Sequence, residues 1–266
     1  MKSVCRPEAR FWRSLGCRSP VFNAPMAGFT GPEVAPRIEE AGAGMVILGG
    51  YPGDREAYEA SKRIAARGRE EFVVPPEDLP SELSSVDVRV PVLVNVRFTS
   101  PEGAEELCPD LADIVDGVEI NAHCRQREMV EVGGGEALMN EPEKLCEIID
   151  VVASHVGVVS VKLRGPHPSY EDVVSELSTH GGVDFVHVDA MKPGEPTYDL
   201  RYVRLAREAG LRVVGNNSVR TPEDVVAMFD AGASAVSVGR PLLEGRWDLL
   251  GELSEFAVGR FWKAGE

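Results

Sequence analysis

Polar side chains that could carry out chemistry recur at the ends of short apolar runs in this sequence. One such run ends with Glu119, Asn121 and His123 at every second position, and Cys124 follows directly. Alternate residues of a β-strand point to the same side, so these three side chains are predicted to share one face. A thiol beside amide and imidazole groups is suited to proton transfer or nucleophilic chemistry. We therefore predict that Cys124 belongs to an active site, although an inert buried thiol is the simpler alternative.

Charged residues alternate in the same way in the two runs that follow. Lys162 and Arg164 share a face of the first, and His187 and Asp189 share a face of the second. A lone lysine at a strand end is often a surface residue, but a lysine paired with an arginine on one face is typical of a site for an anion or a cofactor. His187 fits a hydrogen-bonded core residue as well as it fits a site residue.

The last two apolar runs end in glycine-containing turns. The segments GNNSV (residues 215–219) and VGRPLL (residues 238–243) supply backbone amides, and Arg240 adds a guanidinium group. Backbone amides after the seventh and eighth strands form the usual phosphate site of a parallel barrel, and arginine binds phosphate through two parallel hydrogen bonds. This pattern predicts a phosphorylated cofactor or substrate. Near the N-terminus, Pro25-Met26-Ala27-Gly28 is small and kinked, which suits close approach by a flat ligand.

The elements that must position these residues alternate along the chain. Apolar runs rich in valine and isoleucine are separated by helical patterns, one of which has Thr221 as its N-cap, Pro222 in its first turn and Gly232 after its end. Eight strands alternating with helices predict a single (β/α)8 TIM barrel of the α/β class. A doubly wound open sheet is the alternative, but no Gly-x-Gly-x-x-Gly motif follows the first strand. The predicted strands are residues 21–28, 44–50, 90–98, 116–124, 158–165, 184–191, 211–219 and 233–243.

The domain prediction is one barrel over residues 1–266, with an N-terminal extension at 1–20 and a final helix at 244–266. The connection between the second and third strands is unusually long. We expect a helix at residues 57–72 and a proline-broken loop at 73–87 within it.

Composition restricts the partners. With 28 Lys and Arg against 43 Asp and Glu, the formal charge is −15, which disfavours general nucleic-acid binding. No window approaches the roughly 18 apolar residues of a membrane helix, and no signal peptide is evident. The 5 cysteines lack a CxxC pair, which fits reduced thiols and no zinc site. We therefore expect a cytoplasmic protein with no metal and no membrane partner; its oligomeric state is open.

Taken together, the motifs resemble the FMN-binding barrels of the tRNA-dihydrouridine synthase family, which are relatives of the dihydroorotate dehydrogenases. The resemblance runs from residue 21 to about residue 243, with the motifs in the family's order. The matching segments are Ala-Pro-Met-Ala-Gly (24–28), VEINAHC (118–124) followed by Gly135, Ala137 and Leu138, VKLR (161–164), GNN (215–217) and VGR (238–240).

The resemblance implies specific roles. It implies FMN as the cofactor, a reduced nicotinamide cofactor as a candidate electron donor, and Cys124 as the general acid that protonates one carbon of a pyrimidine double bond after hydride reaches the other. The implied FMN-binding residues are Pro25, Met26, Asn95 (where the family has Gln), Lys162, Gly215, Asn216, Gly239 and Arg240. The implied substrate-binding residues are Asn121 and Arg164, to which the strand-end pattern adds His123, His187 and Asp189.

The sequence departs from the family's pattern at three places. His123-Cys124-Arg125 stands where the family has Gly-Cys-Pro, Asp189 stands where it has a histidine, and Met191 stands where it has an arginine. Because a carboxylate repels a phosphate, Asp189 disfavours a contact with the cofactor phosphate at this position. Only 26 residues follow Arg240, so we expect no counterpart of the family's C-terminal helical domain, which binds tRNA.

Three functions follow, in this order of preference. The first is an FMN-dependent oxidoreductase that transfers hydride to or from a carbon–carbon double bond of a small pyrimidine-like heterocycle. The second is a true tRNA-dihydrouridine synthase, which the charge of −15 disfavours. The third is a barrel without catalytic activity that binds a phosphorylated ligand.

Overall fold

Eight short parallel strands form the centre of the structure, a computed structural model that describes residues 6–262. Neighbouring strands pair in the order β1-β8-β7-β6-β5-β4-β3-β2. Every strand contains valine and is buried along most of its length, as expected for a parallel sheet that helices cover. The strands are β1 (Val21–Asn23), β2 (Val46–Pro52), β3 (Val92–Arg97), β4 (Gly117–Ala122), β5 (Val158–Arg164), β6 (Phe185–Asp189), β7 (Val213–Asn216) and β8 (Ala235–Val238).

The buried side chain of Asn23 links β1 and β2, the first and last strands of this pairing order. The Nδ2 atom of Asn23 on β1 donates to the Ile47 carbonyl oxygen on β2 at 2.7 Å, and the Ile47 backbone N donates to Asn23 Oδ1 at 2.8 Å. The side-chain amide thus replaces a missing pair of backbone hydrogen bonds. The ring of strands confirms the predicted (β/α)8 barrel and excludes the open sheet.

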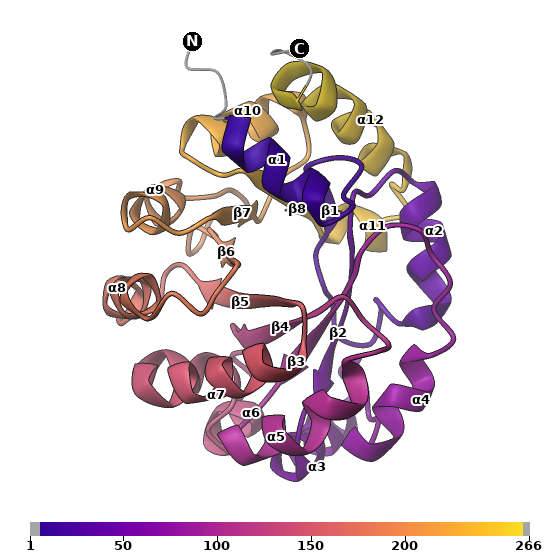
Figure 1. Ribbon diagram of the computed structural model, residues 1–266, viewed down its shortest axis with the longest axis vertical. Coiled ribbons are helices and arrows are strands. Elements are labelled where there is room, and N and C mark those ends of the chain that lie inside the picture. Colours follow the sequence, from indigo (N-terminus) through magenta and orange to yellow (C-terminus); the bar gives the residue numbers. More distant parts are fainter. Residues whose placement is uncertain (1–5, 263–266) are drawn as a thin grey trace.

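Helices surround the ring of strands (Figure 1). The predicted helix after β7 is present as α10, where the side chains of Thr221 and Asp224 form a capping box. The helices are α1 (Arg6–Ser14), α2 (Ala35–Glu40), α3 (Arg55–Ala66), α4 (Leu79–Leu83), α5 (Pro101–Leu111), α6 (Arg127–Glu131), α7 (Pro142–His155), α8 (Tyr170–His180), α9 (Arg201–Glu208), α10 (Pro222–Asp230), α11 (Arg240–Leu243) and α12 (Asp248–Ala257), with 3-10 turns at Pro32–Val34, Pro76–Asp78 and Gly135–Asn140.

The N-terminal helix α1 packs against the end of the barrel where the strands begin. Trp12 is fully buried there, with edge-on ring contacts to Phe22 and Phe185 and a hydrogen bond from Nε1 to Ser234 Oγ of 3.1 Å. Because α1 covers this end of the barrel, ligands must enter from the opposite end, where the strands terminate.

Several predicted boundaries were wrong. The helix expected at 57–72 is α3, which ends at Ala66 shortly before Gly68, a glycine with φ of +78°. The loop expected at 73–87 contains the Pro76–Asp78 turn and α4. Helix α9 lies between β6 and β7, as the alternation of strands and helices in the predicted barrel requires.

The last helix also differs from the prediction. It begins at Asp248 and continues into a π-helical turn, Val258–Trp262, and the rest of the predicted helix lies outside the described residues. No helix within residues 6–262 is long and apolar enough to cross a membrane.

Candidate active site

A cavity of about 890 Å³ opens where the strands end. Its volume lies within the range of small-molecule sites, about 300–1,000 Å³. Residues from strands β2 to β6 and from the segments that follow β1, β7 and β8 meet there, as the barrel prediction requires. The predicted site residues that line it are Pro25, Met26, Asn121, His123, Cys124, Lys162, Arg164, Asp189 and Arg240.

The other predicted site residues do not line this cavity. Asn95 and His187 are completely buried beneath it. The Asn216 side chain turns toward β8, where Nδ2 donates to Ser237 Oγ at 2.7 Å. Gly215 and Gly239 are also not lining residues, although Gly239 directly precedes Arg240.

Asn95 and His187 belong to a hydrogen-bonded chain through the barrel core. Glu119 is its centre: Oε1 accepts from Asn95 Nδ2 at 2.7 Å, and Oε2 lies 2.8 Å from His187 Nδ1. The other ring nitrogen of His187 is 2.7 Å from Ser237 Oγ. Burial would raise the pKa of Glu119, but His187 and Lys162 outweigh it and hold the pKa below its ordinary value. The cavity therefore has a negative charge directly beneath its floor.

Lys162 is the cation above that charge. Its side chain is 3% exposed and lines the cavity, and no hydrogen bond or ion pair involves it within residues 6–262. Burial lowers its pKa, and Glu119 and Asp189 oppose this shift. A buried ammonium group without a direct partner is costly unless a ligand supplies an acceptor.

The main chain around Cys124 is held from two sides. Asn121 Oδ1 accepts hydrogen bonds from the backbone N of His123 at 3.1 Å and of Cys124 at 2.8 Å. On the other side, the backbone N of Glu136 donates to the Cys124 carbonyl oxygen at 2.8 Å. Gly135 has φ of +60°, and a Cβ there would lie 2.2 Å from that oxygen, so this position requires glycine.

Asn121 is itself fixed from below. Its Nδ2 donates to Asn95 Oδ1 at 2.7 Å, which connects the Cys124 loop to Glu119. Asn95 therefore supports Asn121, and its amide is already occupied within the protein. The side chain of Cys124 is half-buried and packs against α3 and α6, with part of it on the cavity wall.

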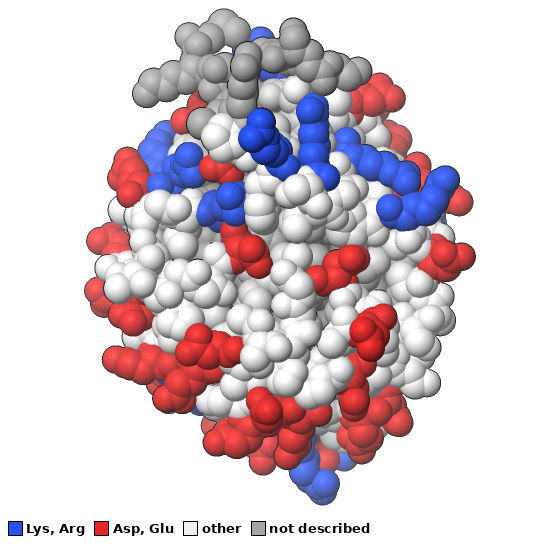
Figure 2. All heavy atoms as spheres, in the orientation of Figure 1, with Lys and Arg blue, Asp and Glu red and all other residues white. Residues whose placement is uncertain are grey.

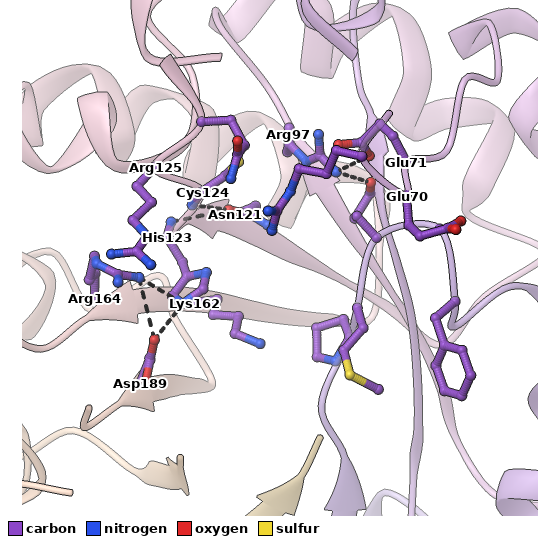
Figure 3. A pocket seen from close by; sticks show the side chains of 18 of the residues that line it. Glu70, Glu71, Arg97, Asn121, His123, Cys124, Arg125, Lys162, Arg164 and Asp189 are labelled. Carbon is purple, nitrogen blue, oxygen red and sulfur yellow. Dashed lines mark hydrogen bonds and ion pairs between the residues drawn. The ribbon is translucent and has the colours of Figure 1, made fainter. Parts of the chain in front are cut away.

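Asp189 is the centre of a second cluster (Figure 3). Its Oδ2 lies 2.6 Å from His123 Nε2 and 3.5 Å from Arg164 Nη1, and its Oδ1 accepts from Asn217 Nδ2 at 2.8 Å and from the Met191 backbone N at 3.2 Å. Burial would raise the pKa of Asp189, but His123, Asn217 and Lys162 outweigh it and lower the pKa. The carboxylate is thus ionised and compensated within the protein.

One part of the cavity wall was not predicted from the sequence. Glu71 lies on the connection between β2 and β3 and forms an ion pair of 2.5 Å with Arg97 of β3; each side chain is 2% exposed. Arg97 Nη2 also donates to the Gly50 carbonyl oxygen at 2.6 Å. Glu71 falls within the helix predicted at residues 57–72, so its buried ion pair with Arg97 was not expected from the sequence.

The cavity fits FMN. Lys162 offers an unpaired donor to an electron-rich ring edge, and Met26 supplies apolar wall area. Arg240 and Asn217 line the part of the cavity near the last two strands, where a phosphate group would lie. The repulsion between Asp189 and a phosphate is reduced because Arg164 and the hydrogen bond from His123 compensate the charge of the carboxylate.

The protein-family model described as dihydrouridine synthase (Dus) matches residues 77–250. A protein of Methanocaldococcus jannaschii described as uncharacterized is 30% identical over 243 residues, which is 88% of this chain and 93% of that protein. The tRNA-dihydrouridine synthase B of Yersinia pestis is 24% identical, and the alignment covers 82% of this chain and 66% of that enzyme.

Dihydroorotate dehydrogenases are also similar. The catalytic subunit of dihydroorotate dehydrogenase B (NAD(+)) from Methanopyrus kandleri is 29% identical over 201 residues, which is 64% of this chain and 60% of that subunit. Among solved structures, the ferulenol complex of DHODH from Eimeria tenella has a TM-score of 0.69 at 14% identity, covering 92% of this chain and 82% of that one. At this identity the structural likeness supports the fold alone.

Proposed function

Because the chain belongs to the dihydrouridine synthase family, we propose that it binds FMN in the cavity and transfers hydride to or from a carbon–carbon double bond of a small pyrimidine-like heterocycle. Membership of this family, with its dihydroorotate dehydrogenase relatives, makes the chain an FMN-dependent oxidoreductase acting on carbon–carbon bonds. The substrate and the residue roles are the proposed part.

The observation that carries the proposal is the unpaired ammonium group of Lys162 in a cavity that also exposes Cys124. A cation near the pyrimidine edge of a flavin stabilises the reduced, anionic ring. Glu119 beneath the floor and Asp189 on the wall help Lys162 to remain charged. Cys124 supplies a proton to the carbon that does not receive the hydride.

Bound FMN would supply or accept the hydride. The other steps belong to the chain itself. Cys124 Sγ gives its proton to the second carbon, so that its S–H bond breaks as a C–H bond forms. Asn121 holds the backbone of this cysteine, and Arg164 orients the substrate. A reduced nicotinamide cofactor is the proposed electron donor.

The visible absorption spectrum tests the cofactor. We expect the purified protein to show flavin bands, or to acquire them on addition of FMN. Lys162→Met is expected to weaken FMN binding by roughly 10- to 100-fold, since a hydrogen bond to a charged group contributes about 1.5–3 kcal/mol. Lys62→Met, at an exposed pair with Glu59 on α3, is the control and should bind FMN normally. A colourless protein that takes up no FMN would exclude the proposal.

A gel shift with unmodified tRNA at two salt concentrations tests the alternative substrate. The formal charge of −15 favours a small substrate. Figure 2 shows acidic side chains concentrated on the lower part of one face and Lys and Arg side chains gathered near its top. We expect no salt-sensitive shift at micromolar protein. Binding that weakens steeply with salt would show contact with phosphates and would favour tRNA.

A further inference from the structure

The imidazole of His123 is held by Asp189 at the cavity wall. The His123 Nε2 atom lies 2.6 Å from Asp189 Oδ2 and 3.2 Å from Arg164 Nη1. The side chain is 27% exposed, and Figure 3 shows it pointing from the end of β4 toward Asp189. Four donors already surround the Asp189 carboxylate, so its position is well determined.

These distances determine which ring nitrogen carries the proton. An ionised carboxylate has only acceptors, so at 2.6 Å from Oδ2 the Nε2 atom must carry hydrogen. The opposite assignment would let Nε2 accept from Arg164 at 3.2 Å, but it would place lone pairs of Nε2 and Oδ2 against each other. Burial lowers the pKa of His123; Asp189 opposes this, and Lys162 and Arg164 add to it, so the ring is neutral. Its Nδ1 therefore carries a lone pair.

The Nδ1 atom is open to the cavity. No hydrogen bond involves it in residues 6–262, and it is not among the buried polar atoms without a partner. Two side-chain acceptors of the cavity wall are occupied: Asp189 by its four donors, and Asn121 Oδ1 by two backbone amides. Glu70 lies across the cavity from His123 in Figure 3. On the His123 side, the wall thus combines one free acceptor with the donors Lys162 and Arg164.

An acceptor beside donors is complementary to a ring edge in which an N–H adjoins a C=O. We propose that His123, with its tautomer fixed by Asp189, accepts a hydrogen bond from a ring N–H of the substrate and selects heterocycles with such a lactam edge. This inference deepens the proposed function and rests on it. His123 is then a specificity-determining residue, and Asp189 is a positioning residue.

The first test is the tautomer. In protein with 15N-labelled histidine, saturated with FMN, the His123 resonances, assigned by their loss in His123→Leu, are expected to be those of a neutral ring protonated at Nε2 at pH 7. Asp189→Asn is expected to give a mixture of tautomers, because an amide can either accept from Nε2 or donate to it. A wild-type ring protonated at Nδ1, or at both nitrogens, would overturn the inference.

The second test is selection, with uracil, 1-methyluracil and 3-methyluracil as probes and the shift of the His123 Nδ1 resonance as the readout in wild type. We expect one of the two methylated probes to bind at least tenfold more weakly than uracil, because its methyl group replaces the ring N–H that donates to His123 Nδ1. In His123→Leu, binding is followed through flavin absorbance. We expect uracil to bind this variant at least tenfold more weakly than it binds wild type. The same methyl group should weaken binding to the variant by less than threefold. His180→Leu, at the end of α8, is the control.

The results separate the two levels of the proposal. A colourless protein rejects the FMN site, while the tautomer of His123 can still be measured. A protein that binds FMN but binds the three probes equally, or binds none of them, overturns the selection by His123 and leaves the FMN site intact.

Discussion

Cys124→Ala is expected to retain its bound flavin and to lose turnover by about 10²- to 10⁴-fold, the usual contribution of a positioned proton donor. The side chain packs against α3 and α6, and its loop is held through the backbone by Asn121 and Glu136, so removing the thiol leaves these contacts in place. The measurement is oxidation of reduced nicotinamide with the heterocycle that the wild-type protein consumes, together with the flavin spectrum of each variant.

Cys146→Ala is the matched control. This thiol lies in α7, where burial raises its pKa to about 11, and it does not line the cavity. We expect its turnover to equal that of wild type. Unchanged turnover in Cys124→Ala would refute the general-acid role, and loss of the flavin in that variant would show that the thiol supports the cofactor site instead.

Arg97→Met is expected to destabilise the protein by about 3–5 kcal/mol, because it leaves the Glu71 carboxylate buried without its cation. The Gly50 carbonyl oxygen also loses a donor. Urea unfolding measures the loss. The double variant Glu71→Leu/Arg97→Met removes both charges and should recover most of the stability, since a buried ion pair replaced by apolar side chains is often neutral in stability.

The exposed pair Arg127 and Glu131 on α6 is the comparison. Its N–O distance of 2.6 Å is similar, but the side chains are 85% and 51% exposed. Arg127→Met should therefore change stability little, because water screens the pair. An equal loss of stability in Arg97→Met and Arg127→Met would contradict the conclusion that burial makes the Glu71–Arg97 pair important for stability.

The strands and the location of the site followed from local patterns in the sequence. Runs of β-branched residues alternating with capped helices predict a parallel barrel, and in a barrel the polar residues at strand ends converge on one cavity. Cys124, Lys162 and Asp189 were found in this way, and all three line the cavity. The period of two residues determines which side chains of a strand share a face, and this needs no knowledge of the neighbouring strands.

Tertiary structure decided how deep each residue lies. Asn121, Lys162 and His187 are in register across β4, β5 and β6, yet the first two line the cavity while His187 lies in the core. Strands in a barrel are tilted against its axis, so a row of neighbours in register descends from one strand to the next. Alternation along one strand cannot reveal this descent, which explains why His187 was expected to contact ligands; Asn95 was assigned from the family resemblance alone.

The sequence by itself therefore determined the barrel, the family and the candidate thiol, because these depend on short-range periodicity and motif order. Only the tertiary structure paired His123 with Asp189, Glu71 with Arg97 and Asn23 with Ile47. These partners are far apart in sequence, and each contact depends on the tilt and closure of the barrel or on the path of a long connection. Folding places the Asp189 carboxylate where it orients the His123 imidazole beside the proposed proton donor.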